Sequence, residues 1–180
     1  MKTEKGDRRT PTWFFEQCSN RFGPFDCDIA ASRENHLCDA FFSVDGLDAF
    51  SVDCWLRTNW GNVPYGPPGA IERWITKARE QRDRHGCRTL LLLPADTSTK
   101  WYHDVSRTEL TELVPFRLAF SAPDGSTKGN SAKFGSLLVW IAPRITRPNV
   151  ARFEPHPDTD CKCPSQHGRI CPVHGRDGGV

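Results

Sequence analysis

Apolar side chains recur every three or four positions in several segments, the spacing that places them on one face of a helix. In the first such segment, Phe14, Cys18 and Phe22 follow Thr10-Pro11, a typical helix start, and precede Gly23, a typical helix end. We expect helices over residues 10–23, 32–41, 71–86 and 98–108.

Other segments have the patterns of strands. Leu90 to Leu93 form a continuous apolar run before Pro94, as expected for a strand buried on both faces. Phe25 to Ile29 alternates apolar and acidic side chains. We expect strands at residues 25–29, 55–60, 90–93, 117–120 and 136–142. Because strands alternate with helices, the fold class is α/β, a doubly wound and mostly parallel sheet that binds ligands at its strands' carboxyl ends.

The chain length suits one domain with a tail, because 37% of its 180 residues are hydrophobic and this apolar pattern ends near Pro143. No stretch approaches the roughly 20 apolar residues of a membrane span, and no secretory signal follows the charged start, so we expect a cytoplasmic protein. The expected layout is a polar leader (1–9), a catalytic domain (10–143), a linker (144–160) and a metal-binding tail (161–180).

The net charge of +2 says little about partners, but one short region is strongly basic. Two interpretations have equal weight here: a nucleic-acid contact or a solvated helix face. The basic region contains Arg73, Lys77, Arg79, Arg82, Arg84 and Arg88.

The eight cysteines fall into two groups. Five are scattered through the body, as is usual for reduced core residues. The tail instead interleaves cysteine with histidine, which indicates a metal site, and four such ligands suffice for tetrahedral zinc. The preferred set is Cys161, Cys163, Cys171 and His174, with His167 as the alternate ligand and a redox-reactive tail as the alternative interpretation.

The loop Asn62-Val63-Pro64-Tyr65 carries the clearest chemical signal, although taken alone it could be a surface turn. The amino group of adenine is a poor nucleophile because its lone pair is delocalised into the ring. The Asn62 carboxamide oxygen and the Val63 carbonyl could accept its two hydrogens, with Pro64 fixing that carbonyl. Tyr65 could stack on a base that has been flipped out of the duplex.

The loop resembles the Asn/Asp-Pro-Pro-Tyr motif of amino-group methyltransferases, and its surroundings resemble the phage-type DNA N-6-adenine methyltransferases (Dam-like). In that family a Thr-Pro opening, an Asp-containing strand, an Asp-Gly-Leu segment, the catalytic loop and a Leu-Leu-Pro-Ala strand with Trp-aromatic-His occur in this order. The matching segments here are Thr10-Pro11, 26–32, 45–47, 62–66, 92–95 and 101–103.

The resemblance, which covers roughly residues 10 to 142, implies a Rossmann-like methyltransferase fold, S-adenosylmethionine as cofactor and DNA as partner. It implies catalytic roles for Asn62, Val63, Pro64 and Tyr65, cofactor contacts to methionine from Thr10 and Asp28, and a contact to adenosine from Asp45. Asp48 and Asp53 are alternatives to Asp45.

This chain departs from the family pattern in two places. Val63 replaces the first proline of the motif, which keeps the carbonyl, and Ala30 and Ala31 stand where a glycine-rich turn usually approaches the cofactor. Alternative functions are methylation of a cytosine amino group or of RNA adenine, and nucleic-acid binding without catalysis. A nucleotide-binding oxidoreductase is poorly supported, because no Gly-x-Gly-x-x-Gly turn follows an expected strand. Protection of DNA from restriction is a plausible role.

Overall fold

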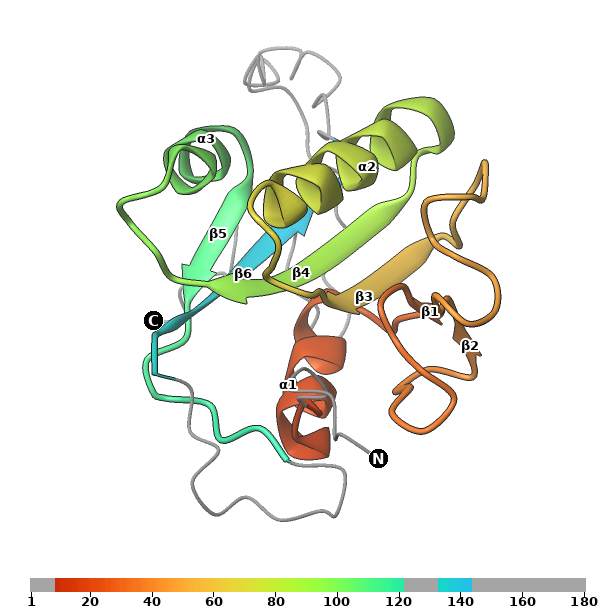
Figure 1. Ribbon diagram of the computed structural model, residues 1–180, viewed down its shortest axis with the longest axis horizontal. Helices are drawn as coiled ribbons and strands as arrows, with labels where there is room; N and C mark the ends of the chain where they lie inside the picture. Colours follow the sequence, from red (N-terminus) through yellow and green to blue (C-terminus); the bar gives the residue numbers. More distant parts are fainter. Residues whose placement is uncertain (1–8, 122–132, 144–180) are drawn as a thin grey trace, which may run out of the picture. The chain divides into compact units, whose positions relative to one another are not determined.

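A computed structural model of the protein describes residues 9–121 and 133–143. In this part of the chain, one mixed sheet carries helices on both faces (Figure 1). The elements in chain order are α1 (Thr12–Phe22), β1 (Cys27–Asp28), β2 (Ala40–Phe41), β3 (Thr58–Asn62), α2 (Ala70–His85), β4 (Arg88–Pro94), α3 (Lys100–Thr108), β5 (Leu110–Leu113) and β6 (Ser136–Ile141).

The six strands follow the order β2-β1-β3-β4-β6-β5. The first four in this order are parallel, which confirms a mostly parallel α/β sheet. β6 runs antiparallel to both of its neighbours, so β5 points the same way as β4. We call the side where β1 to β4 end the carboxyl edge of the sheet, and the opposite side the amino edge.

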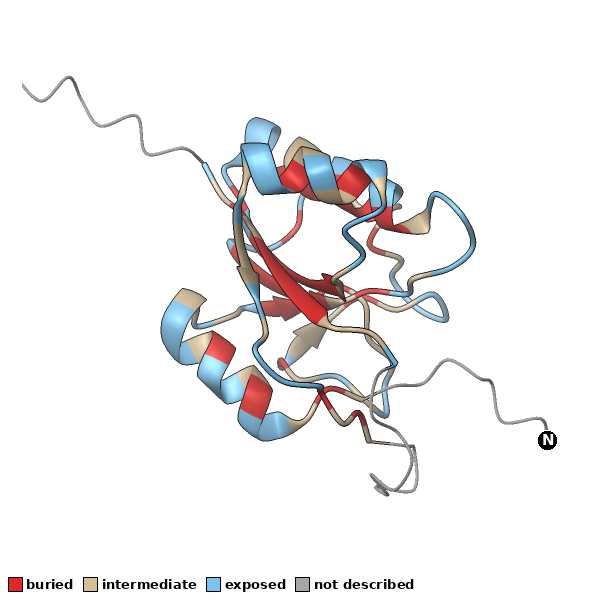
Figure 2. Cartoon of the chain, turned by 90° about the vertical axis from the view of Figure 1, so that its left-hand side faces the viewer, coloured by how far each residue is buried: buried red, intermediate tan, exposed pale blue. Residues whose placement is uncertain are grey.

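Two apolar layers hold the sheet between its helices, and Figure 2 shows buried residues concentrated on the strands. On one face, α2 and α3 pack against Leu91 and Leu93 of the central strand. On the other face, α1 packs against Leu90 and Leu92. A continuous leucine run therefore suits β4 because both of its faces are covered.

Glycine fixes the geometry at two points. A Cβ on Gly61 would lie 2.9 Å from a side-chain carbon of Ile29 and 3.2 Å from one of Leu91, so β3 can sit between its neighbours only with glycine there. Gly86 ends α2 in the left-handed region, with φ of 71°, as its sequence position predicts.

The predicted helix over residues 32–41 is wrong, because turns and the short strand β2 occupy that segment. Side chains compete there for the backbone donors that a helix would use. The Asn35 carboxamide accepts the Ser32 N–H at 2.6 Å, and the Asp28 carboxylate accepts the Leu37 N–H at 3.2 Å.

The predicted strand at residues 117–120 is also wrong. The strand that pairs with β6 is Leu110–Leu113, which follows α3 almost directly. Leu118 and Phe120 are buried beneath α1, and the residues around them form isolated bridges only, one of which joins Arg9 and Ser121. Their apolar alternation reflects burial against a helix and not a place in the sheet. Among the described residues no helix is long and apolar enough to cross a membrane.

Candidate active site

The loop that the sequence predicts to be catalytic, Asn62 to Tyr65, begins where β3 ends, at the carboxyl edge. Asn62 is the last residue of β3 and lies in register with Leu92 of β4. Val63 is 2% exposed and belongs to the core beneath α2, whereas Pro64 is exposed. The buried valine side chain anchors the loop, so its backbone follows a fixed path between Asn62 and Tyr65.

Tyr65 lies partly buried beside Asn62. Its hydroxyl donates a long hydrogen bond of 3.5 Å to the Asn62 carboxamide oxygen. A bond of this length is weak, so another donor can replace it at little cost. The Asn62 oxygen is therefore within reach of a second group that enters beside Tyr65.

Phe134, which the sequence did not single out, adds a second aromatic ring to this loop. The centroids of the Phe134 and Tyr65 rings are 5.6 Å apart, and the ring planes are inclined at 69°, an edge-to-face arrangement. The segment is held by the Ala95 N–H, which donates to the Gly135 carbonyl at 2.8 Å just after β4. No periodicity could have revealed this contact, because Phe134 follows a polar Gly/Ser/Lys segment.

Asp28 ends β1 at the same edge and is 4% exposed. Its carboxylate accepts the N–H groups of Ala30 at 3.3 Å and Leu37 at 3.2 Å. Burial raises the pKa of Asp28 to about 6, while these two hydrogen bonds and nearby His36 oppose the rise. The side chain thus organises the turn that lacks the family's glycines, and it titrates within the physiological range.

Thr10 precedes α1 and does not cap it as expected, because Pro11 is the capping residue and no side chain accepts a helix amide. Thr10 is 7% exposed, and its hydroxyl has no hydrogen-bond partner within residues 9–121 and 133–143. Its position is fixed by the neighbouring bridge, in which Arg9 and Ser121 exchange backbone hydrogen bonds of 3.1 and 3.0 Å. A buried polar atom of this kind suits a bound polar ligand.

The three candidate aspartates beyond β2 differ in their surroundings. Asp45 is exposed in a turn and makes no hydrogen bond or ion pair within the described residues. Asp48 accepts the Phe50 N–H at 3.2 Å. Asp53 pairs with Arg84 at the end of α2, which is the amino edge. The placement therefore favours Asp45 over Asp53 as a ligand at the carboxyl edge.

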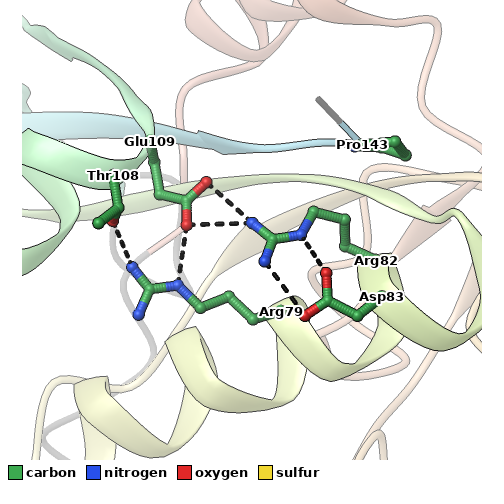
Figure 3. Close-up of a pocket in the computed structure, with 6 residues that line it drawn as sticks. All are labelled: Arg79, Arg82, Asp83, Thr108, Glu109 and Pro143. Atoms are coloured by element: carbon green, nitrogen blue, oxygen red, sulfur yellow. Dashed lines mark hydrogen bonds and ion pairs between the residues drawn. The ribbon is translucent and has the colours of Figure 1, made fainter. Parts of the chain in front are cut away.

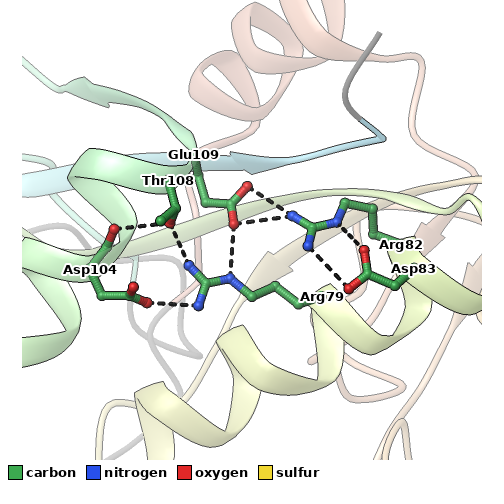
Figure 4. A network of polar contacts seen from close by, with 6 residues as sticks. All are labelled: Arg79, Arg82, Asp83, Asp104, Thr108 and Glu109. Atoms are coloured by element: carbon green, nitrogen blue, oxygen red, sulfur yellow. Dashed lines mark hydrogen bonds and ion pairs between the residues drawn. The ribbon is translucent and has the colours of Figure 1, made fainter. Parts of the chain in front are cut away.

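The basic run lies mostly on α2, and its central arginines are neutralised. Arg79 bonds to Asp104 at 2.7 Å and to Glu109 at 2.8 Å, and Arg82 bonds to Asp83 at 2.7 Å (Figure 4). The hollow beside them presents these paired groups together with Thr108 and Pro143 (Figure 3).

The remaining members of the run are paired in part. Arg84 pairs with Glu80 at 2.9 Å, and Lys77 lies 3.5 Å from the same carboxylate. The guanidinium carbon of Arg73 lies over the Phe50 ring, 3.9 Å from the ring centroid. For these paired cations the structure favours a solvated helix face over a phosphate contact, because nearby carboxylates already neutralise them. Arg73 and Arg88 make no ion pair within the described residues.

The cysteines of the body are free thiols, of which Cys54 alone is exposed. Burial raises the pKa of Cys18, Cys27 and Cys38 to about 12, so these thiols stay protonated and unreactive. No group of three or more potential metal ligands occurs in the part of the chain that the structure describes. The proposed zinc ligands Cys161, Cys163, Cys171 and His174 lie outside it.

Comparisons with known proteins agree on one family. The family model described as DNA N-6-adenine-methyltransferase (Dam) matches residues 1–153. The DNA N-6-adenine-methyltransferase of Escherichia phage T1 is 33% identical over 196 residues, covering 93% of this chain and 75% of the phage protein. That of Haemophilus phage HP1 (strain HP1c1) is 26% identical over 148 residues, covering 79% of this chain and 83% of the phage protein. The match to the family model spans every described element.

Proposed function

Because this chain belongs to the DNA N-6-adenine-methyltransferase (Dam) family, we propose that the loop from Asn62 to Tyr65 binds the adenine that it methylates. The enzyme transfers a methyl group from S-adenosylmethionine to the exocyclic amino group of adenine in DNA. The placement of Asn62 beside Tyr65 at the carboxyl edge carries this assignment.

The loop acts through fixed hydrogen-bond acceptors. The Asn62 carboxamide oxygen and the Val63 carbonyl accept the two amino hydrogens and make the nitrogen lone pair available for attack. The amino group replaces the weak 3.5 Å bond from the Tyr65 hydroxyl. The burial of Val63 supports this role, because a carbonyl on an anchored backbone needs no reorganisation during the reaction.

Tyr65 stacks on the flipped adenine, and Phe134 braces its ring edge-on. Flipping is required because the amino group is paired inside the duplex. The bracing matters because stacking positions the base only if the ring itself is held. Pro64 restricts the backbone between the acceptor carbonyl and this ring.

S-adenosylmethionine supplies the methyl group in an activated sulfonium form, so a strong general base is unnecessary. The residues at the carboxyl edge fit this cofactor. The Thr10 hydroxyl, which has no partner in the described part of the chain, and the Asp28 carboxylate would hold its methionine part, and Asp45 its adenosine part. Asp28 suits a cationic group because a ligand ammonium would stabilise its ionised form.

The finer fold assignment is a doubly wound, Rossmann-like methyltransferase fold. The helices on both faces of the sheet and the antiparallel β6 between β4 and β5 are consistent with it. DNA and the cofactor would meet in the cytoplasm of a bacterial or phage-infected cell.

The decisive experiment measures transfer of a labelled methyl group from S-adenosylmethionine to unmethylated DNA. Asn62→Ala should lower the rate about 100- to 1,000-fold while cofactor binding stays intact, since only an interaction with the reacting group is lost. Pro68→Ala, at an exposed position of the same loop, is the control and should keep normal activity. Unchanged transfer by Asn62→Ala would refute the assignment of this loop.

We also propose, from the sequence alone, that the tail binds one zinc ion through Cys161, Cys163, Cys171 and His174. Metal analysis of the purified full chain should find about one zinc per molecule, and Cys171→Ser should release it. Full zinc content in the Cys171→Ser variant would remove this residue from the ligand set. The same measurement on His167→Ala tests the alternate ligand.

A further inference from the structure

An exposed aromatic pair lies outside the catalytic loop. Trp13, in the first turn of α1, is 49% exposed, and Phe116, in the segment after β5, is 43% exposed. Their ring centroids are 5.7 Å apart. Phe14 supports both from the core side, with centroids 5.7 Å from Trp13 and 6.4 Å from Phe116. Two large rings are therefore held rigidly at the surface.

The fold places this pair at the carboxyl edge. β5 points the same way as β4, so the segment that follows Leu113 leaves the sheet from the edge where Asn62 lies. The Val114 N–H donates to the Ser136 carbonyl at 2.9 Å, and the Arg9–Ser121 bridge joins the end of this segment to the start of α1.

The charges around the pair favour a polyanion. Arg117 follows Phe116 directly, is exposed and has no ion-pair partner within the described residues. The nearby carboxylate of Glu112 is already neutralised by Arg21 at 2.6 Å. Glu16 is exposed one turn along α1 from Trp13, and its negative charge repels phosphate. A phosphate of the DNA backbone would therefore bind on the Arg117 side of the pair. This arrangement differs from that of Arg79, Arg82 and Arg84 on α2, which are paired with carboxylates.

We propose that Trp13, Phe116 and Arg117 form a DNA-contact surface that stacks on bases next to the flipped adenine. The proposal rests on the proposed function, because flipping exposes the faces of the neighbouring bases and of the unpaired partner base. Exposed aromatic rings bind such faces with little sequence preference, and an adjacent guanidinium binds the backbone phosphate.

The test compares the Michaelis constant for DNA with that for S-adenosylmethionine. Trp13→Ala and Phe116→Ala should each raise the constant for DNA about tenfold, while kcat and the constant for the cofactor change less than about twofold. Trp13→Phe, which keeps a ring, should recover most of the loss. Arg117→Ala should weaken binding to all DNA sequences and reduce its salt dependence. Leu56→Ala and Arg88→Ala, exposed positions at the amino edge, are the matched controls.

Direct binding of a labelled duplex, measured by anisotropy without turnover, separates this proposal from the proposed function. Loss of DNA affinity in the aromatic variants supports the surface even if Asn62→Ala shows that the loop is misassigned. Unchanged affinity in folded Trp13→Ala and Phe116→Ala would overturn the surface while leaving the loop assignment intact. The DNA-contact surface would also be overturned if these variants kept their DNA affinity but sedimented as a smaller species than the unmodified protein. The aromatic pair would then join two copies of the chain. If alanine prevents folding, Phe116→Leu, which keeps apolar bulk but has no aromatic face, and Arg117→Ala decide.

Discussion

The two edges of the sheet differ in how their charged side chains are paired. At the amino edge, Arg79 and Arg82 share the carboxylate of Glu109, whose side chain is 5% exposed, and each has a further carboxylate partner. At the carboxyl edge, the Thr10 hydroxyl has no partner in the described part of the chain, and Asp28 is buried with a raised pKa. Paired charges stabilise the fold, whereas a buried carboxyl group with a raised pKa is a candidate for binding a cationic ligand.

This contrast shows that charge density in a sequence is a poor guide to a nucleic-acid contact. The basic run on α2 is the densest positive segment, yet its carboxylate partners include α2's own Glu80 and Asp83 as well as residues of α3 and the residue after it. Arg117 is a single arginine in its segment and remains exposed beside two aromatic rings. Whether a cation can contact DNA depends on its neighbours in space.

The largest expected effect on stability is at the amino edge. Glu109→Ala should lower the free energy of unfolding by about 3 kcal/mol, because it leaves two partly buried guanidinium groups without their shared carboxylate. Urea denaturation measures this loss, and activity per folded molecule should stay normal. Glu112→Ala, which removes an exposed ion pair, is the control and should cost at most about 1 kcal/mol. Equal losses in both variants would mean that burial adds nothing to the Glu109 cluster.

At the carboxyl edge, Tyr65→Ala should lower kcat/KM for DNA by about 10- to 100-fold through loss of base stacking. Tyr65→Phe should retain most of the activity, because its ring remains and the hydroxyl bond to Asn62 is replaced by substrate in any case. Steady-state methylation assays measure both variants. A defect in Tyr65→Phe as large as in Tyr65→Ala would assign the main role to the hydroxyl.

The buried carboxyl at this edge predicts a pH dependence. Because the pKa of Asp28 is raised to about 6, the side chain becomes protonated as the pH falls through that value and loses its attraction for the cofactor ammonium. Affinity for S-adenosylmethionine should therefore fall by up to about tenfold for each pH unit below 6. Calorimetric titration between pH 5 and pH 8 measures this slope.

Asp28→Asn should bind the cofactor more weakly at pH 8 and show a flatter profile. Asp39→Asn, at an exposed position on the same loop, should behave as the unmodified enzyme does. If the profile of Asp28→Asn keeps its full slope, another group is responsible for the titration.

The smallest expected effect separates binding from stability at one residue. Thr10→Val should weaken cofactor binding about three- to tenfold, because one hydrogen bond to the ligand is lost. The same change should leave the cofactor-free protein as stable as before or slightly more stable, since the hydroxyl has no hydrogen-bond partner among residues 9–121 and 133–143. Thr10→Ser keeps the hydroxyl and should bind normally. Destabilisation of the cofactor-free Thr10→Val variant would show that the hydroxyl is needed for folding.

The sequence predicts those features that depend on neighbours along the chain. The leucine run of β4 and the Gly86 end of α2 are confirmed because local patterning and backbone conformation determine them. The position of the Asn62–Tyr65 loop after a strand is confirmed for the same reason. The roles of its individual residues stay predictions until the variants are measured.

Features that depend on distant partners could not be predicted. Asp28 reorganises residues 30–37 through a hydrogen bond to Leu37, which prevents the expected helix. The contact of Phe134 with Tyr65 joins positions far apart in the sequence, as does that of Phe116 with Trp13. Periodicity carries no information about such pairs, and each of them contributes to the carboxyl edge.

The position of β6 also affects when the sheet can fold during synthesis of the chain. β4 pairs with β3 on one side and with β6 on the other, and β6 is the last strand of the described chain. Until the ribosome has released Ser136–Ile141, the leucines of β4 have an unpaired backbone edge. Nascent chains that stop before this point would expose a strongly apolar strand to aggregation, so folding of the central sheet must wait for nearly the whole domain to be synthesised.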